Sequence, residues 1–204
     1  MNKTQIVILW GLAVLVVIVF AVLSQVISRA PPQSAAVTVP PARQVHLSDT
    51  HSLKKLYPRA DQAARTWQGD ALLAAATASW SFVQMEHLEA ANDWTLQFYS
   101  PSTQQLQVLT ANEKHILPIV TSLSPYELPT VAMENWRVDS HQALSTWLNA
   151  GGAAFLDRYS VVDISARLGF SKEKRLEWSV VGVVRDTQTF HQVRIDATSG
   201  EVIP

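Results

Sequence analysis

The stretch Glu177–Pro204, "EWSVVGVVRDTQTFHQVRIDATSGEVIP", decides which fold the sequence predicts. A Trp opens an alternation of apolar and polar residues, a polar turn follows, and a second alternation ends in a short polar break. Such alternation is typical of half-buried β-strands, and the Asp and Gly of the break favour a tight turn. The stretch therefore predicts a hairpin followed by a short closing strand.

The same rhythm occurs earlier, in Asp93–Ile119, "DWTLQFYSPSTQQLQVLTANEKHILPI". Each copy follows a segment with apolar residues at helical spacing, "DQAARTWQGDALLAAATASW" from Asp61 and "SHQALSTWLNAGGAAFLDRY" from Ser140. Asp139 or Ser140 is expected to cap the second helix, because a short side chain with an oxygen can accept from the free N–H groups of the first turn. The sequence thus predicts an α+β fold in which a helix and four short antiparallel strands occur twice.

The motif "VRIDATSGEVI", residues 193–203, predicts the geometry of the last turn. Asp196 is expected to accept hydrogen bonds from backbone N–H groups ahead of it, and Gly200 to adopt a positive φ. We therefore assign Asp196 a structural role and no catalytic one.

Residues 138–204 resemble the PepSY domain through the helix, the strand that begins near "EWSVV" and the closing "IDATSGEV". Residues 61–119 resemble it as a degenerate copy, in which "LTANEK" replaces the Asp–Gly turn. The resemblance implies tandem cystatin-like units, each with a helix packed on a curled antiparallel sheet. The family is associated with exported, peptidase-linked and cell-envelope proteins, as an inhibitory or protein-binding module and not as an enzyme. In layout, the chain also resembles a cell-wall-elongation regulator family of Gram-positive bacteria.

The segment Ile6–Ile27, "IVILWGLAVLVVIVFAVLSQVI", is almost entirely apolar. About 20 apolar residues suffice to cross a bilayer core of about 30 Å, whereas a cleaved signal peptide, the alternative, has an apolar region of about 7–15 residues. The sequence therefore predicts an uncleaved transmembrane anchor at residues 1–28. Since only a few residues precede it, we expect Met1 in the cytoplasm and the rest of the chain outside.

Proline and alanine mark the boundaries that follow. The predicted order after the anchor is a Pro/Ala-rich spacer with room for a short helix (29–60), a first PepSY-like unit (61–119), a linker interrupted by prolines (120–137) and a second PepSY-like unit (138–204).

Motifs for catalysis and for metal or phosphate binding are absent from the sequence. A zinc site needs three or four converging ligands, yet the chain has no Cys and its six His residues share no ligand spacing. Glu86 and Glu89 flank His87 in a pattern typical of a solvated rim, and neither a nucleophile elbow nor a glycine-rich phosphate loop occurs. The sequence predicts no catalytic, cofactor-binding or metal-binding residue and no cofactor. The six histidines are His46, His51, His87, His115, His141 and His191.

Tryptophan is unusually frequent, with seven residues in the chain. Trp67 and Trp147 occupy matching helix positions, and Trp94 and Trp178 matching strand starts. We expect each to pack helix against sheet within its own unit; the alternative is that some line a peptide-binding groove. Trp136 has no counterpart and is expected to lie between the two units.

These features predict a membrane-anchored extracytoplasmic module that is no enzyme. It is expected to cross the membrane once and to bind an envelope protein or peptide, in a peptidase- or cell-wall-related role. The alternative is an accessory subunit of a larger membrane complex, and an enzyme is the third class considered. With a net charge of −1 and both signs of charge interspersed, nucleic acid is not an expected partner. The sequence leaves the oligomeric state open.

Overall fold

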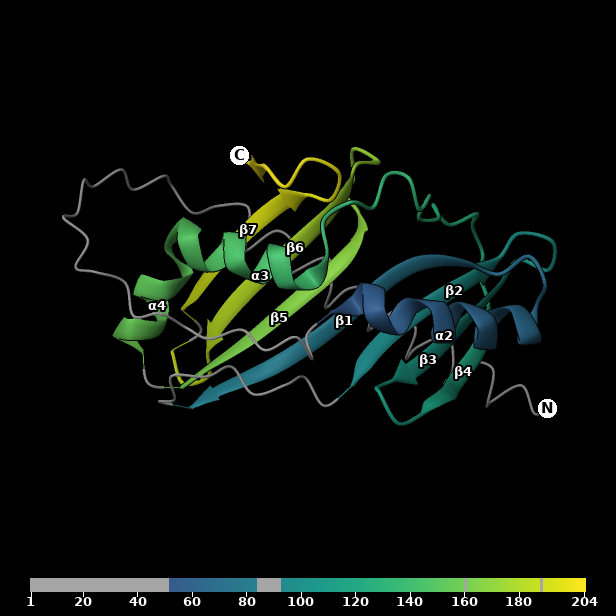
Figure 1. Cartoon of the computed structure of the whole chain (residues 1–204), viewed down its shortest axis with the longest axis horizontal. Coiled ribbons are helices and arrows are strands. Elements are labelled where there is room, and N and C mark those ends of the chain that lie inside the picture. The colour runs from purple at the N-terminus through teal and green to yellow at the C-terminus, as the bar shows by residue number, and fades with distance from the viewer. Residues whose placement is uncertain (1–51, 84–92, 160, 188) are drawn as a thin grey trace, which may run out of the picture. The chain divides into compact units, whose positions relative to one another are not determined.

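The computed structural model of the chain describes residues 52–83, 93–159, 161–187 and 189–204. Within these ranges, all strands form a single eight-stranded antiparallel sheet in the order β4-β3-β2-β1-β5-β6-β7-β8 (Figure 1). The elements of the first half are α2 (Leu53–Trp67), β1 (Leu72–Val83), β2 (Trp94–Ser100), β3 (Gln105–Ala111) and β4 (Ile116–Leu123). Those of the second half are α3 (Ser140–Trp147), a π-helical turn (Leu148–Gly152), α4 (Ala153–Arg158), β5 (Val161–Phe170), β6 (Leu176–Val184), β7 (Phe190–Asp196) and β8 (Val202–Ile203).

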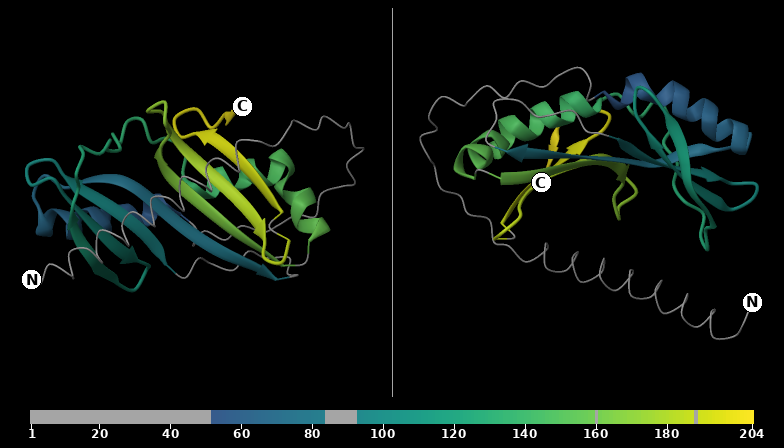
Figure 2. Two further views of the ribbon diagram at one scale, coloured as in Figure 1. Left: turned by 180° about the vertical axis from the view of Figure 1, so that it is seen from behind. Right: turned by 90° about the horizontal axis from the view of Figure 1, so that it is seen from below.

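The two halves meet where β1 pairs with β5. The pairing runs antiparallel from Ala76 opposite Leu168 to Val83 opposite Val161. Helix α2 packs on the strands of the first half and α3 on those of the second, and both lie on the same face of the sheet (Figure 2). The other face carries no helix from the described part of the chain, an arrangement that antiparallel sheets often adopt.

The predicted fold, tandem cystatin-like units behind a transmembrane helix, is wrong. The β1–β5 pairing joins all eight strands into one sheet over one core, so the described residues form a sheet-rich fold and not two separate helix-on-sheet units. No helix in the described ranges is long and apolar enough to cross a membrane, which conflicts with the predicted transmembrane signal anchor. The residues to which we assigned that anchor, 1–28, lie outside the described part.

The alanine-rich stretch after Gly69 is also not the helix that its apolar spacing predicted. Helix α2 ends at Trp67, and residues from Leu72 onward form β1, which pairs with β2 on one side and β5 on the other. A strand in the middle of a sheet is covered by neighbours at both edges, so tertiary pairing overrides the helix propensity of alanine. Helix α2 itself begins at Leu53, inside the stretch 29–60 that was predicted as a spacer with room for a short helix.

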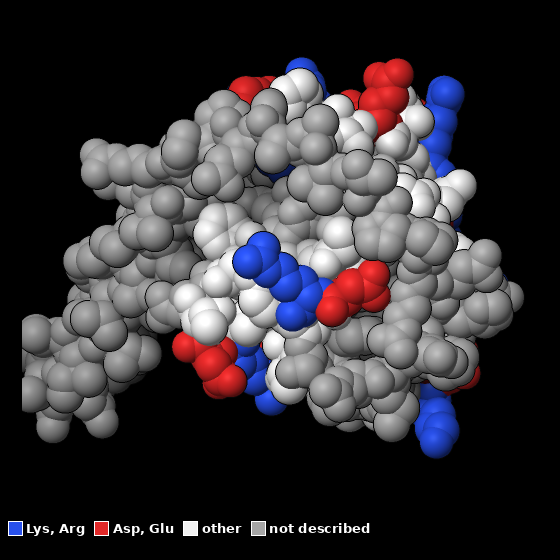
Figure 3. Space-filling model, turned by 90° about the vertical axis from the view of Figure 1, so that its left-hand side faces the viewer, with Lys and Arg blue, Asp and Glu red and all other residues white. Residues whose placement is uncertain are grey.

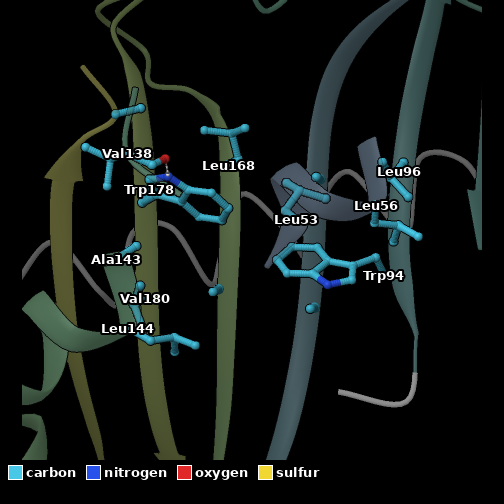
Figure 4. Packing of buried hydrophobic residues seen from close by; sticks show 14 of the residues in the cluster. Leu53, Leu56, Trp94, Leu96, Val138, Ala143, Leu144, Leu168, Trp178 and Val180 are labelled. Atoms are coloured by element: carbon cyan, nitrogen blue, oxygen red, sulfur yellow. Dashed lines mark hydrogen bonds between the residues drawn. The ribbon is translucent and has the colours of Figure 1, made fainter. Parts of the chain in front are cut away.

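The tryptophans form the centre of the core. Trp94 and Trp178 lie edge to face with ring centroids 6.2 Å apart, and Trp80 packs on Trp94 in the same way at 6.0 Å. Figure 4 shows Trp94 beside Leu53 and Trp178 beside Leu168, with the two rings facing each other across β1 and β5. The expectation that each Trp packs only within its own unit is therefore wrong, because this pair bridges the two halves.

Trp136 joins the halves a second time, as its position between them led us to expect. Its ring meets Tyr57 of α2 edge to face at 5.5 Å, and its indole N–H donates to the carbonyl of Val138 at 2.8 Å. Trp178 donates to the same carbonyl at 2.9 Å and has no exposed surface, so its assignment to the core and not to a groove is confirmed.

The last turn has the predicted geometry. The Asp196 carboxylate accepts from the backbone N–H groups of Thr198 and Ser199 at 2.8 and 2.9 Å, and Gly200 has φ +81°. These hydrogen bonds lower the pKa of Asp196, since they stabilise its ionised form.

Candidate functional site

Strand β4 forms one edge of the sheet and is long for an unprotected edge. It spans Ile116–Leu123 and, within the described residues, pairs only with β3. The opposite edge is β8, which has only the two residues Val202–Ile203. Short edge strands are one way in which proteins prevent unwanted pairing, and β4 does not use it.

Large apolar side chains are exposed along β4 and just beyond it. The exposed fractions are 52% for Leu117, 60% for Ile119, 50% for Val120, 74% for Leu123 and 76% for Tyr126. We call these five residues the apolar edge. Single exposed apolar side chains are normal, whereas five in one short uncharged stretch are typical of an interaction surface.

The hydrogen bonds at the two ends of the β3–β4 ladder show which backbone groups of β4 point away from β3. Asn112 donates to the carbonyl of His115 at 2.9 Å, and Ser124 donates to the carbonyl of Gln104 at 2.8 Å. Hydrogen-bonded and non-hydrogen-bonded pairs alternate along an antiparallel ladder, so each of these bonds fixes the alternation of the residues next to it.

Counting inward from the Asn112–His115 bond, the backbone groups of Ile116 and Pro118 point away from β3. Counting inward from the Gln104–Ser124 bond, those of Leu123 and Thr121 do so. The two sets are out of phase because Ile119 is an extra residue, a bulge between the pairs Leu109–Pro118 and Val108–Val120. Pro118 has no N–H, which is tolerated where the group would point to solvent. Thr121 and Leu123 each offer an outward donor and acceptor.

Proteins protect edge strands with proline, bulges and charged side chains. Strand β4 has the first two, but no residue from Ile116 to Tyr126 is charged. Its protection is therefore partial: proline and the bulge interrupt the edge near its middle, while the segment after the bulge remains open to pairing.

Charged residues lie only at the two ends of this strand. In the β3–β4 turn, Arg59 of α2 donates to the carbonyl of Glu113 at 2.5 Å, and His115 lies 3.6 Å from the carboxylate of Asp93. Lys114 belongs to the same turn and is exposed, and Glu127 follows the apolar edge at its other end. The surface around the edge thus combines an uncharged middle with charged flanks.

A second cluster surrounds His191 on β7. Its ring centroid lies 5.8 Å from that of Trp147 and 5.9 Å from that of Phe155, and Nε2 lies 3.1 Å from the carbonyl oxygen of Ala150 in the π-helical turn. Burial lowers the pKa of His191, because the apolar surroundings disfavour the charged imidazolium. Among the described residues, the ring nitrogen Nε2 is held by a backbone carbonyl and not by a carboxylate.

Close packing explains the glycines of this second cluster. A Cβ on Gly182 of β6 would lie 2.8 Å from Cζ2 of Trp147, so glycine is needed for the indole to rest on the sheet. Gly151 has φ +109°, a left-handed conformation that favours glycine. Ala150 and Gly151 in the π-helical turn have non-helical dihedral angles, so the turn is a kink between α3 and α4, and it places the carbonyl of Ala150 against the ring of His191.

The remaining buried charge is fully paired. Arg194 donates to both carboxylate oxygens of Glu177, at 3.0 and 2.8 Å, on the face of the sheet without helices. This hydrogen bonding raises the pKa of the Arg194 guanidinium. A bidentate pair of this kind positions two neighbouring strands and leaves no reactive group free.

In the part of the chain that the structure describes, the histidines and carboxylates considered in the sequence do not form a cluster. His115, His141 and His191 lie on the β3–β4 turn, α3 and β7, respectively. Among the described residues, no group of three His, Asp or Glu side chains could hold a metal ion. The remaining histidines and the two glutamates lie outside the described part of the chain: His46, His51, His87, Glu86 and Glu89.

Charge of one sign does not gather on the face that Figure 3 presents. Lys and Arg side chains lie beside Asp and Glu side chains there, among uncharged residues. Arg185 and Asp163 form one of the exposed ion pairs of the described residues. The apolar edge therefore differs more from an ordinary protein surface than this face does.

The apolar edge was not predicted from the sequence. Four short strands in each half make "HILPI" of the first half and "EVIP" of the second equivalent closing strands, whereas the first lies in an eight-residue strand and the second in a two-residue one. The usable signal was the uncharged run from Ile116 to Tyr126, in which apolar residues do not alternate strictly. A strand with one face in water is expected to alternate.

The chain matches no known protein family, and no curated protein matches it. The resemblance to the PepSY domain therefore stays a prediction. Among solved structures, the chain is similar to a "putative lipoprotein" from Clostridium difficile 630, with a TM-score of 0.47 and 12% sequence identity over 76% of this chain and 97% of that one. A likeness at this level does not establish what the chain does or where it acts.

Proposed function

We propose that this chain is a non-catalytic protein-binding module of the cell envelope, and that it binds by taking up an extended segment of its partner beside β4. The observation that carries the proposal is the apolar edge: an uncharged edge strand with outward-pointing backbone groups and five exposed apolar side chains. In strand addition, main-chain hydrogen bonds supply affinity and alternate side chains supply specificity. Strand β4 offers both.

The proposed location outside the cytoplasm is supported by the sequence. The apolar run Ile6–Ile27 is of the kind that directs a chain to export. A partner in the envelope, peptidase-linked or concerned with the cell wall, agrees with the resemblance of residues 138–204 to the PepSY domain. Fractionation of cells that express the full chain, with protease added to intact spheroplasts, tests this part separately.

The binding site is tested by photo-crosslinking in living cells. A photoreactive phenylalanine analogue replaces Val120 on the apolar edge or, as a matched control, Val202 on the opposite edge. Both valines are 50% exposed, so the two probes differ in place and not in access. We expect adducts of higher mass from position 120 and none from position 202.

Equal adducts from both positions, or none from position 120, would contradict binding at β4. The melting temperature of each variant is measured first, since an unfolded chain would expose both positions. Because both side chains project from edge strands, we expect both variants to melt like the unmodified chain.

A further inference from the structure

We infer that the strand which adds to β4 is β4 of a second copy of this chain, so that two sheets join across a two-fold axis. The inference rests on the proposed function, because it uses the same edge. Most homo-oligomers are symmetric, and a two-fold contact brings the same surface of both copies together. A surface that pairs with itself must be self-complementary in hydrogen bonding, in charge and in shape.

The hydrogen-bonding pattern of β4 meets this condition in one register. Two antiparallel strands pair only where outward-pointing residues face each other. The bulge places the outward residues at 116 and 118 on one side and at 121 and 123 on the other. With residue 116 of one copy opposite 123 of the other, 118 lies opposite 121, and all four outward positions are paired.

Other symmetric registers use fewer of these positions. If Thr121 faces Leu123, for example, the bulge of each strand lies against the segment beyond Ser124 of the other, and Ile116 has no partner. The bulge, which would disturb pairing with a regular strand, therefore fits its own copy. In the favoured register the missing N–H of Pro118 removes only one hydrogen bond from each half of the contact.

The charges at the ends of β4 do not oppose this arrangement. The end where the strand begins carries both signs, Arg59 and Lys114 beside Asp93 and Glu113, and Glu127 lies beyond the other end. Antiparallel pairing brings the beginning of one strand to the end of the other, so Glu127 approaches a flank of mixed sign and not one of like sign. Between the flanks no charge from Ile116 to Tyr126 opposes the contact.

The apolar side chains gather near the axis in this register. Val120 of one copy lies opposite Ile119 of the other, and these two are 50% and 60% exposed in the single chain. Burying such side chains is favourable by about 25 cal/mol per Å² of apolar surface. These two side chains are thereby partly removed from water by the second copy.

Cysteine crosslinking tests the register, since the chain contains no cysteine of its own. In the proposed contact Leu117 lies opposite Ser122 as a non-hydrogen-bonded pair, with Cα atoms about 4.5 Å apart. Within one copy the same two residues are about 16 Å apart along the strand, too far for a disulfide. The double variant Leu117→Cys/Ser122→Cys, expressed as the full chain in cells and oxidised, is expected to migrate as a dimer that reductant returns to the monomer.

The single variants Leu117→Cys and Ser122→Cys are the matched controls. Their cysteines lie five residues out of register with their own copies, so we expect monomers under the same oxidation. A double variant that forms no more dimer than the singles would overturn the inference. If position 120 still photo-crosslinks to a different protein in that case, binding at β4 remains supported. Only the identification of the partner as a second copy of this chain is then wrong.

Discussion

The carbonyl of Val138 accepts the indole N–H groups of both Trp136 and Trp178, and so connects the segment before α3 to the sheet. Trp178 is fully buried. Replacing it with alanine is expected to lower the free energy of unfolding by about 3–5 kcal/mol, the usual range for deleting a buried aromatic side chain. Trp178→Phe keeps a ring beside Trp94 and is expected to cost less, because Val138 retains its bond from Trp136. Urea denaturation measures both, and an alanine variant as stable as the original chain would refute the assignment to the core.

His191 makes the stability of the second half depend on pH. Burial lowers its pKa below the ordinary value of 6.5, so folding favours the neutral ring. The stabilising contribution is therefore complete above pH 6.5 and decreases as the pH falls below it, because the unfolded chain then binds the proton more readily. We expect the melting temperature to fall more steeply between pH 7 and pH 5 in the original chain than in His191→Phe. Parallel slopes for the two proteins would show that His191 is not the group responsible.

At the scale of elements, one short segment caps two helices. The Asp139 carboxylate accepts from the backbone N–H of Ser140 at 2.8 Å and of Lys54 at 3.1 Å, and from the hydroxyl of Ser52 at 2.5 Å. Ser140 in turn accepts from the N–H of Leu53 at 2.8 Å. The first turns of α2 and α3 therefore hold each other, and the two halves are coupled through their caps.

This coupling can be measured with a double-mutant cycle. Asp139→Ala is expected to cost about 1–2 kcal/mol as a lost N-cap, and more if the effect on α2 adds to it. Residues in direct contact show interaction energies of about 0.5–3 kcal/mol, so Ser52→Ala should cost less in the Asp139→Ala background than in the original chain. Strictly additive losses in urea denaturation would mean that the two helices are capped independently.

Elements within each half were better predicted than the connections between halves. The Asx-turn of Asp196, the positive φ of Gly200 and the hairpins follow from local chemistry, which is written in neighbouring residues. The strand character of the alanine-rich stretch after Leu72 does not, because alanine favours helix unless neighbouring strands cover it. The sequence left Asp139 and Ser140 as alternative caps of α3. The structure uses Asp139 as that cap, whereas Ser140 accepts from the N–H of Leu53 in α2, whose own N-cap is Ser52.

For the whole molecule, the decisive contact is the one between β1 and β5, which no local pattern reveals. A sequence with two helix-and-hairpin segments shows the same local patterns whether the first strands of the two halves pair or stay apart. The patterns therefore do not distinguish one sheet from two separate units. The apolar edge has the same origin: β4 is exposed because β1 occupies the middle of the sheet, and this follows only from the strand order. Exposure at an edge is thus a property of the assembled sheet and not of the segment.

The central claim, binding by strand addition at β4, is tested most directly by removing one backbone N–H. Thr121 points its N–H away from β3, so Thr121→Pro deletes a group that strand addition needs and the sheet does not, whereas Thr121→Ala keeps it. Both variants carry the photoreactive residue at position 120, and their melting temperatures are compared first to confirm that both fold. We expect adducts to persist in Thr121→Ala and to disappear in Thr121→Pro. Equal adduct yields from two folded variants would contradict strand addition and leave only side-chain contact at this edge.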